Sequence, residues 1–481
     1  MDNPGFELQE DGVQRTYPNK SLQTIYQEYK HEEKKSCSLM KIFLVCFLAC
    51  LITTAIGVLI LCLVYLGQIG QGTSQPVMNP SAPGMGKPPQ STNSSTTTTA
   101  PEPRFYFLSQ VSKSKVFEFE GGAIQWARYR DNPKDYANVK EMQFGASINQ
   151  HRSKMTLETL RILSKGLRAP HWHFNANEHG FLVQGKAWIG VVDDGGVEVT
   201  TYNVTAGQVI FFPKNTLHWV KNVGDDDCLF VLFFTTHDEL STLDVDDAFY
   251  LTPEDIAARS LKPEGGVNFI RTFKKPKEDQ AINLPKNLVE LIQNASYVQS
   301  SDSKVWQYFY DLKGSREFIF PGGTIQWARY RKNGVGLNDT EKIYSESVNS
   351  HDDTLTLGTL RIKSNGLRQP HFHFNAHEMG YVISGCGQIG IVGDKPVQDF
   401  SIGIGDVFFF PIGTQHYIKS TCDEDLFMIL GFSTGNQLET LDMDDYFHAT
   451  SDHILAQLFL KKQSEFKKIP KFKEDQAVNL P

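Results

Sequence analysis

The stretch Gly166-Leu167-Arg168-Ala169-Pro170-His171-Trp172-His173-Phe174-Asn175-Ala176-Asn177-Glu178 decides the fold of this chain. His171 and His173 stand at i and i+2, so both imidazoles point to the same face of an extended strand. Glu178 follows five residues after His173, and His218 lies further downstream. Three neutral imidazoles and one carboxylate suit a divalent transition metal with coordination positions to spare. The stretch therefore predicts a metal site on a strand.

The same arrangement recurs in the second half of the chain, and we expect a second metal site from His371, His373, Glu378 and His416. The repeat extends beyond these residues. Gly121–Arg130 returns almost unchanged as Gly322–Arg331, and Lys277–Pro285 returns as the last nine residues, Lys473–Pro481. The sequence therefore predicts two tandem domains, 104–285 and 305–481, joined by a linker over 286–304.

Each copy alternates short apolar runs with clusters of Gly, Pro, Asn and Asp. Runs of this kind at regular spacing are typical of antiparallel strands in a barrel or jelly roll. Thr252-Pro253 and the residues that follow indicate a helix after the first barrel, and we expect the same after the second. The predicted class is all-β, with two jelly-roll barrels that each carry a short helical appendage.

These motifs resemble those of the cupin superfamily, and more closely those of the two-domain oxalate decarboxylases. The first motif pairs the two histidines with a glutamate and a closing glycine, here Gly185 and Gly385. The second motif contains the distal histidine, with Asn215 where glycine is usual in domain 1 and Gly413 in domain 2. Asparagine also tolerates positive φ, so this departure is mild. The second motif closes on Asn222 in domain 1, whereas domain 2 has Ser420 in place of the usual asparagine. The resemblance spans most of residues 104–481.

The resemblance implies a manganese-dependent enzyme that converts oxalate to formate and CO₂, with O₂ as co-substrate; Fe(II) would also suit the ligands. Arg168 and Arg368 match an arginine that holds the substrate, because a guanidinium fork fits a carboxylate. A surface ion pair is the alternative role for each.

The lid segment, Thr235–Leu243 in domain 1 and Ser433–Leu441 in domain 2, follows the last strand of each barrel. Glu239 aligns with the family's lid glutamate, which returns a proton, whereas domain 2 has Gln437. A solvated loop carboxylate is the alternative for Glu239.

We expect domain 1 to be the site of turnover, because it alone has an acid at the position that aligns with the lid glutamate. Two other functions stay open at this point. An oxalate oxidase producing H₂O₂ and CO₂ would need no lid acid. A non-catalytic binding module could keep its metals structurally, since many cupin lineages share the fold without sharing a reaction.

The N-terminal hundred residues predict a membrane anchor. Residues 42–66 form a run of 25 residues without a charge, which is long enough to span a bilayer as a helix. A signal peptide would have a shorter apolar part nearer the start. Lysines before the run place the polar tail, 1–41, in the cytosol. The Pro-, Ser- and Thr-rich residues 67–103 indicate an extracellular stalk. The prediction is a single-pass type II protein of the plasma membrane.

Glycosylation sequons begin at Asn93, Asn203, Asn294 and Asn338, on the predicted outer side. They favour a glycoprotein only weakly, because such triplets also arise by chance. Cys228, Cys386 and Cys422 lie in the predicted folded region, where at most one internal disulfide can form, and its pairing stays open.

The formal net charge of −8 excludes nucleic acid as the main partner, because phosphate binding needs clustered Lys and Arg. The resemblance also implies that the chain could form a homo-oligomer.

Overall fold

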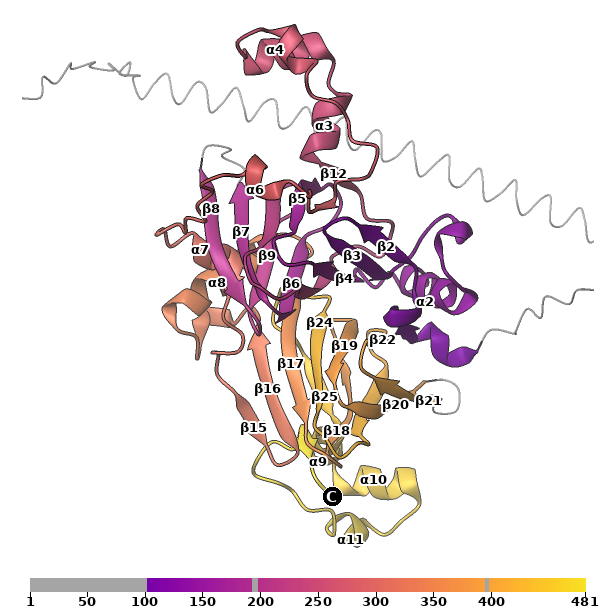
Figure 1. The fold of residues 1–481 in the computed structure, drawn as a ribbon. Helices are drawn as coiled ribbons and strands as arrows, with labels where there is room; N and C mark the ends of the chain where they lie inside the picture. The colour runs from indigo at the N-terminus through magenta and orange to yellow at the C-terminus, as the bar shows by residue number, and fades with distance from the viewer. Residues whose placement is uncertain (1–101, 193–197, 394–397) are drawn as a thin grey trace, which may run out of the picture. The chain divides into compact units, whose positions relative to one another are not determined.

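The computed structural model describes residues 102–192, 198–393 and 398–481, which belong to one compact unit, Thr97–Pro481 (Figure 1). The predicted tail and membrane span lie outside the described residues, as does the predicted stalk apart from its last two residues. Among the helices in these described ranges, none is long and apolar enough to cross a membrane.

Domain 1 consists of two antiparallel sheets. One has the strand order β9-β6-β11-β4-β3-β2, and the other β12-β5-β10-β7-β8, with β13 also paired to β5. Gly185 adopts φ 96° between β6 and β7, so the turn that closes the first motif needs glycine. The strands are β2 (Val116–Phe119), β3 (Gly122–Ala127), β4 (Thr156–Ile162), β5 (Leu167–His173), β6 (Glu178–Gln184), β7 (Lys186–Val192), β8 (Val199–Thr205), β9 (Val209–Phe212), β10 (Leu217–Asn222), β11 (Cys228–Phe234), β12 (Thr242–Asp244) and β13 (Ile282–Asn283).

Domain 2 repeats this arrangement strand for strand. Its sheets have the orders β22-β19-β24-β17-β16-β15 and β21-β20-β23-β18-β25, with β26 paired to β18. The two tandem cupin-like barrels are therefore confirmed. The strands are β15 (Phe318–Phe320), β16 (Gly323–Ala328), β17 (Thr356–Ile362), β18 (Leu367–His373), β19 (Glu378–Ser384), β20 (Cys386–Val392), β21 (Gln398–Gly403), β22 (Asp406–Phe410), β23 (Gln415–Ser420), β24 (Leu426–Phe432), β25 (Thr440–Asp442) and β26 (Val478–Asn479).

The two domains exchange short arms. Strand β1 (Leu108–Gln110) precedes the first barrel but pairs with β22 of the second, whereas β14 (Phe309–Tyr310) precedes the second and pairs with β9 of the first. Each barrel thus completes one sheet of its neighbour. Short 3₁₀ helices lie beside β1 and near the ends of β3 and β16: η1 (Pro103–Tyr106), η2 (Val111–Lys113), η3 (Pro133–Asp135) and η4 (Lys332–Gly334).

The predicted helical appendages are present, but the protein also contains helices that the predicted all-β class did not include. Two twelve-residue helices, α2 (Val139–Gln150) and α8 (Asp339–Ser350), precede the metal-binding strands. Asn338 and Glu341 form a capping box at the start of α8, a sequence signal that could have revealed this helix. The other helices are α3 (Val245–Leu251), α4 (Glu254–Leu261), α5 (Val267–Ile270), α6 (Leu288–Leu291), α7 (Val305–Tyr308), α9 (Met443–Ala449), α10 (Asp452–Phe459) and α11 (Gln463–Phe466).

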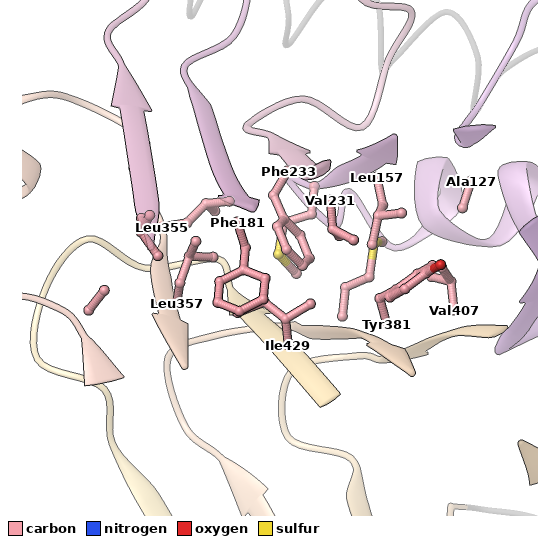
Figure 2. Close-up of a cluster of buried hydrophobic side chains, with 14 of the residues drawn as sticks. Ala127, Leu157, Phe181, Val231, Phe233, Leu355, Leu357, Tyr381, Val407 and Ile429 are labelled. Atoms are coloured by element: carbon pink, nitrogen blue, oxygen red, sulfur yellow. The ribbon is translucent and has the colours of Figure 1, made fainter. Parts of the chain in front are cut away.

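A shared hydrophobic core joins the two barrels, and Figure 2 shows its central side chains. Phe233 of β11 is fully buried there. It lies against Gly431 of β24, where an added Cβ would come within 2.8 Å of the Phe233 ring. The two sheets can approach this closely because glycine leaves room for the ring. Leu157, Phe181, Val231, Leu357, Val407 and Ile429 line the same core.

One disulfide forms among the three cysteines of the described domains. Cys386 at the start of β20 bonds to Cys422, which follows β23, and Cys228 is free and buried. The bond ties two neighbouring strand ends of domain 2 together.

We expect Phe233→Ala to destabilise the folded chain by about 3–5 kcal/mol, because the truncation leaves a cavity in the shared core. Chemical unfolding monitored by tryptophan fluorescence measures the loss. Ile319→Ala is the control, since Ile319 is exposed and should change stability by less than about 0.5 kcal/mol. Equal effects of the two variants would contradict this packing.

Candidate metal centres

Three strands bring the four predicted ligands of domain 1 together. His171 and His173 lie on β5, Glu178 begins β6, and His218 lies on β10 directly opposite His171. All four side chains are buried, and their ligand atoms lie within 4.8 Å of one another. The i, i+2 spacing therefore places both imidazoles on one face, as the sequence predicts.

The outer ring nitrogen of each histidine is already bonded. Nδ1 of His171 lies 2.7 Å from the Ala169 carbonyl, and Nδ1 of His218 lies 2.8 Å from the Thr216 carbonyl. A carbonyl can only accept, so both Nδ1 atoms carry the hydrogen. Nδ1 of His173 meets the Thr242 hydroxyl at 2.9 Å. These partners fix the orientation of the rings and leave Nε2 to face the interior.

The inner nitrogens converge on one carboxylate oxygen. Nε2 of His173 and of His218 lie 3.0 and 3.2 Å from Glu178 Oε2. In the neutral Nδ1–H tautomer, Nε2 of His218 presents a lone pair to an oxygen that can also only accept. Two facing acceptors repel each other unless a cation lies between them. The donor set of the site therefore fits a bound metal ion.

The protonation states are those that a metal requires. Burial lowers the pKa of His173 to about 4, and burial followed by the charge of Arg168 lowers that of His171 well below its usual value. Burial would raise the pKa of Glu178, but its histidine contacts outweigh this and hold it below the ordinary range. Near neutral pH these two imidazoles are thus uncharged while the carboxylate is ionised.

Domain 2 builds the same centre. His373 and His416 place Nε2 at 2.9 and 3.1 Å from Glu378 Oε2, and their Nδ1 atoms bond to Thr440 and to the Thr414 carbonyl. The fourth ligand, His371, has its Nδ1 at 2.8 Å from the Gln369 carbonyl. The structure thus brings together all eight predicted ligands, in two sets of four.

The two arginines lie beside these centres but are engaged in buried ion pairs. Arg168 donates from Nη1 to both oxygens of Asp244, each at 3.1 Å, and to the Ala281 carbonyl. Arg368 uses two nitrogens on Asp442, with Nη1 at 3.0 Å and Nη2 at 2.9 Å from its oxygens. Each arginine thus forms an ion pair, but the pair is buried and not on the surface as the sequence alternative had it. A role in substrate binding stays a prediction.

The lid segment of domain 1 places Glu239 at the surface. Its Oε1 accepts a hydrogen bond from the Asp131 amide at 3.2 Å, and its backbone carbonyl accepts one from Asn175. In domain 2 the Gln437 carbonyl accepts the equivalent bond from Asn375. Glu239 and Gln437 thus occupy matching positions, as the alignment predicts, and only domain 1 has an acid there.

The sequence analysis missed one buried acid, Glu158, in the centre of β4. It is 4% exposed, and burial followed by the charge of Glu178 raises its pKa to about 8. The residue that matches it in the repeat is Gly358, which pairs with Trp327 just as Glu158 pairs with Trp126. Comparing the two repeats position by position would have revealed this difference.

Comparison with known proteins identifies the class that this fold and these sites define. A cupin family model matches residues 135–263 and 337–464, together more than half of the chain, so the chain belongs to the cupin family. A separate model, for a CLLAC-motif containing domain, matches residues 36–65.

Among its relatives, the chain is 24% identical over 331 residues to oxalate decarboxylase OxdC of Bacillus subtilis, an alignment that covers 62% of this chain and 79% of that protein. It is 22% identical to an oxalate decarboxylase of Arthroderma benhamiae, covering 72% of this chain and 78% of that protein. A solved structure of oxalate decarboxylase from Bacillus subtilis at pH 4.6 superposes with a TM-score of 0.60 at 18% identity, covering 77% of this chain and 87% of that chain. The chain is therefore a two-domain cupin of the oxalate decarboxylase-like kind.

We expect His218→Gln to lower the metal content from about two ions per chain to about one, because it removes one ligand from domain 1 alone. Elemental analysis after dialysis measures this content. His237→Gln, a histidine of the lid segment outside both ligand sets, is the control and should retain both ions. Unchanged metal in His218→Gln would show that the ion binds elsewhere.

Proposed function

We propose that this chain is a manganese-dependent oxalate decarboxylase that converts oxalate to formate and CO₂, with domain 1 as the active site. The facing acceptors of both four-residue sets support the metal, and the relationship to oxalate decarboxylases supports the substrate. Bound Mn(II) would supply a redox-active, Lewis-acidic centre to which a small carboxylate can bind. Fe(II) suits the same donors.

Differences between the arginines favour domain 1. Both Arg368 terminal nitrogens contact Asp442, whereas the hydrogen bonds of Arg168 within the described residues all leave from Nη1. In both domains burial, followed by the charge of the arginine, lowers the pKa of the first histidine of the set, so each arginine lies near its centre. We infer that Asp244 holds Arg168 in place while its remaining N–H groups bind the substrate carboxylate.

The lid acid supports the same choice. Glu239 is exposed and so exchanges protons freely with solvent, whereas Gln437 cannot act as an acid. We propose that Glu239 supplies protons to the domain 1 site after C–C cleavage. The oxidase alternative would need no such group, and the binding-module alternative would need neither arginine nor lid acid.

The direct test is incubation of the manganese-loaded chain with oxalate in air at mildly acidic pH. We expect formate, and we expect Glu239→Gln to lower its rate by about tenfold or more and to raise the share of H₂O₂, because a general acid contributes about 10²–10⁴-fold. Domain 2 offers the matched control, Gln437→Ala, which should leave the rate unchanged.

Peroxide without formate from the unaltered chain would favour the oxidase. Bound metal without turnover of oxalate would favour the binding module.

We also propose that the enzyme is anchored in the plasma membrane and acts outside the cell. The support is the uncharged run over 42–66, the lysines that precede it and the polar stretch over 67–103. Asn294, which begins one of the sequons, is exposed in the segment between the domains.

We expect the full-length chain from animal cells to migrate faster on a gel after treatment with an N-glycosidase. Asn294→Gln should remove one glycan from the untreated chain, whereas Asn19→Gln, in a sequon of the predicted cytosolic tail, should remove none. A chain whose mobility does not respond to the glycosidase would contradict the proposed topology.

A further inference from the structure

Glu158 points into the barrel of domain 1. Leu160 and Ile162, two and four residues further along β4, belong to the core of this barrel, whereas Leu157 belongs to the core between the domains. Alternation along the strand therefore directs the Glu158 side chain inward. In the register, Glu158 pairs with Leu232 on β11, and the next inward residue of β11, Phe234, pairs with the metal ligand Glu178.

Burial and the charge of Glu178 raise the pKa of this carboxyl group and outweigh the charges of Arg168 and Arg128, which lower it. None of the described residues donates a hydrogen bond to it, and only 4% of the residue is exposed. An ionised carboxylate buried without donors is costly, so the group is held as a neutral acid. A buried neutral acid that accepts no hydrogen bond from the described residues, on the face that bears a metal ligand, is available to a bound ligand.

Domain 2 lacks both the acid and the space for one. Gly358 replaces Glu158, and a Cβ at Gly358 would lie 2.8 Å from Cε3 of Trp327. In domain 1 the equivalent Trp126 has Arg128 over its ring, 3.8 Å from the centroid. The charges of Glu158 and of Glu239 both act on this guanidinium. Arg128 therefore lies near the buried acid and near the lid acid.

We propose that Glu158 is the group that delivers the proton to the substrate carbon in domain 1, while Glu239 exchanges protons between the lid and solvent. This inference rests on the proposed decarboxylation. When the C–C bond of hydrogen oxalate breaks, its electron pair stays on the carbon that becomes formate, and the other half leaves as CO₂. The Glu158 O–H proton forms the new C–H bond. The product at this point is formic acid, which releases its acidic proton to solvent, and the Glu158 carboxylate takes one proton back from solvent. Hydrogen oxalate thus gives formate and CO₂ with no net oxidation and no net uptake of protons.

The test compares formate and H₂O₂ production from oxalate by the manganese-loaded full chain and its variants. Glu158→Gln keeps the shape and can donate a hydrogen bond, but it cannot give up a proton as an acid. We expect its kcat for formate to fall about 100-fold or more, with KM changed by less than about threefold and a larger share of H₂O₂. Glu158→Asp should restore part of the formate rate.

Glu118→Gln, an exposed glutamate on β2, is the matched control and should behave as the unaltered chain. Metal content and thermal unfolding of each variant show whether it folds.

If Glu158→Gln makes formate as fast as Glu118→Gln, Glu158 is not the donor, although the decarboxylase function stands. If Glu158→Gln makes formate and Glu158→Ala does not, Glu158 only positions the substrate, and the proposal is overturned. If Glu158→Gln does not fold, Glu158→Asp takes its place in the test. A Glu158→Asp variant that folds, binds metal and makes formate as fast as the unaltered chain also overturns the proposal. If the unaltered chain makes no formate, the proposed function itself fails.

Discussion

The repulsion between an imidazole lone pair and a carboxylate oxygen is the constraint on which both centres depend. His218 must carry its hydrogen on Nδ1, because that atom faces the Thr216 carbonyl, and its Nε2 then faces Glu178 at 3.2 Å. His416 and Glu378 meet in the same way at 3.1 Å. A protein interior can hold such an arrangement only with a positive charge at its centre. Burial lowers the pKa of the neighbouring His171 and His173, and a metal ion bound in the set would supply the positive charge.

The barrels hold these ligands in place because sheet register leaves them little freedom. His171 and His218 are direct partners on β5 and β10, and Phe212 stacks on the His218 ring with centroids 4.1 Å apart. The exchanged arms and the shared core then join the two barrels into one unit.

Identical ligands in both domains do not imply identical reactivity. The differences lie around the metal, in Glu158 against Gly358 and in Glu239 against Gln437.

The metal ligands could be predicted from the sequence because strand periodicity turns His-x-His into two side chains on one face. The replacement of glycine by Asn215 could also be judged from a local property, because asparagine tolerates positive φ. Asn215 adopts φ 65° in the structure. Longer-range features could not be predicted. Arms of two or three residues, such as β14 and β1, are too short to show periodicity, and Asp244 lies 76 residues from Arg168. Glu158 lies in a strand that mixes polar and apolar residues, so its inward direction becomes clear only from the register.

The central claim is that a redox-capable cation occupies each set of three histidines and one glutamate. Anomalous X-ray scattering from crystals of natively produced protein, collected at the manganese and iron absorption edges, tests it most directly. The account predicts two peaks per chain, one among His171, His173, Glu178 and His218 and one among the equivalent residues of domain 2. Well-ordered ligand side chains with no peak at either edge would contradict it.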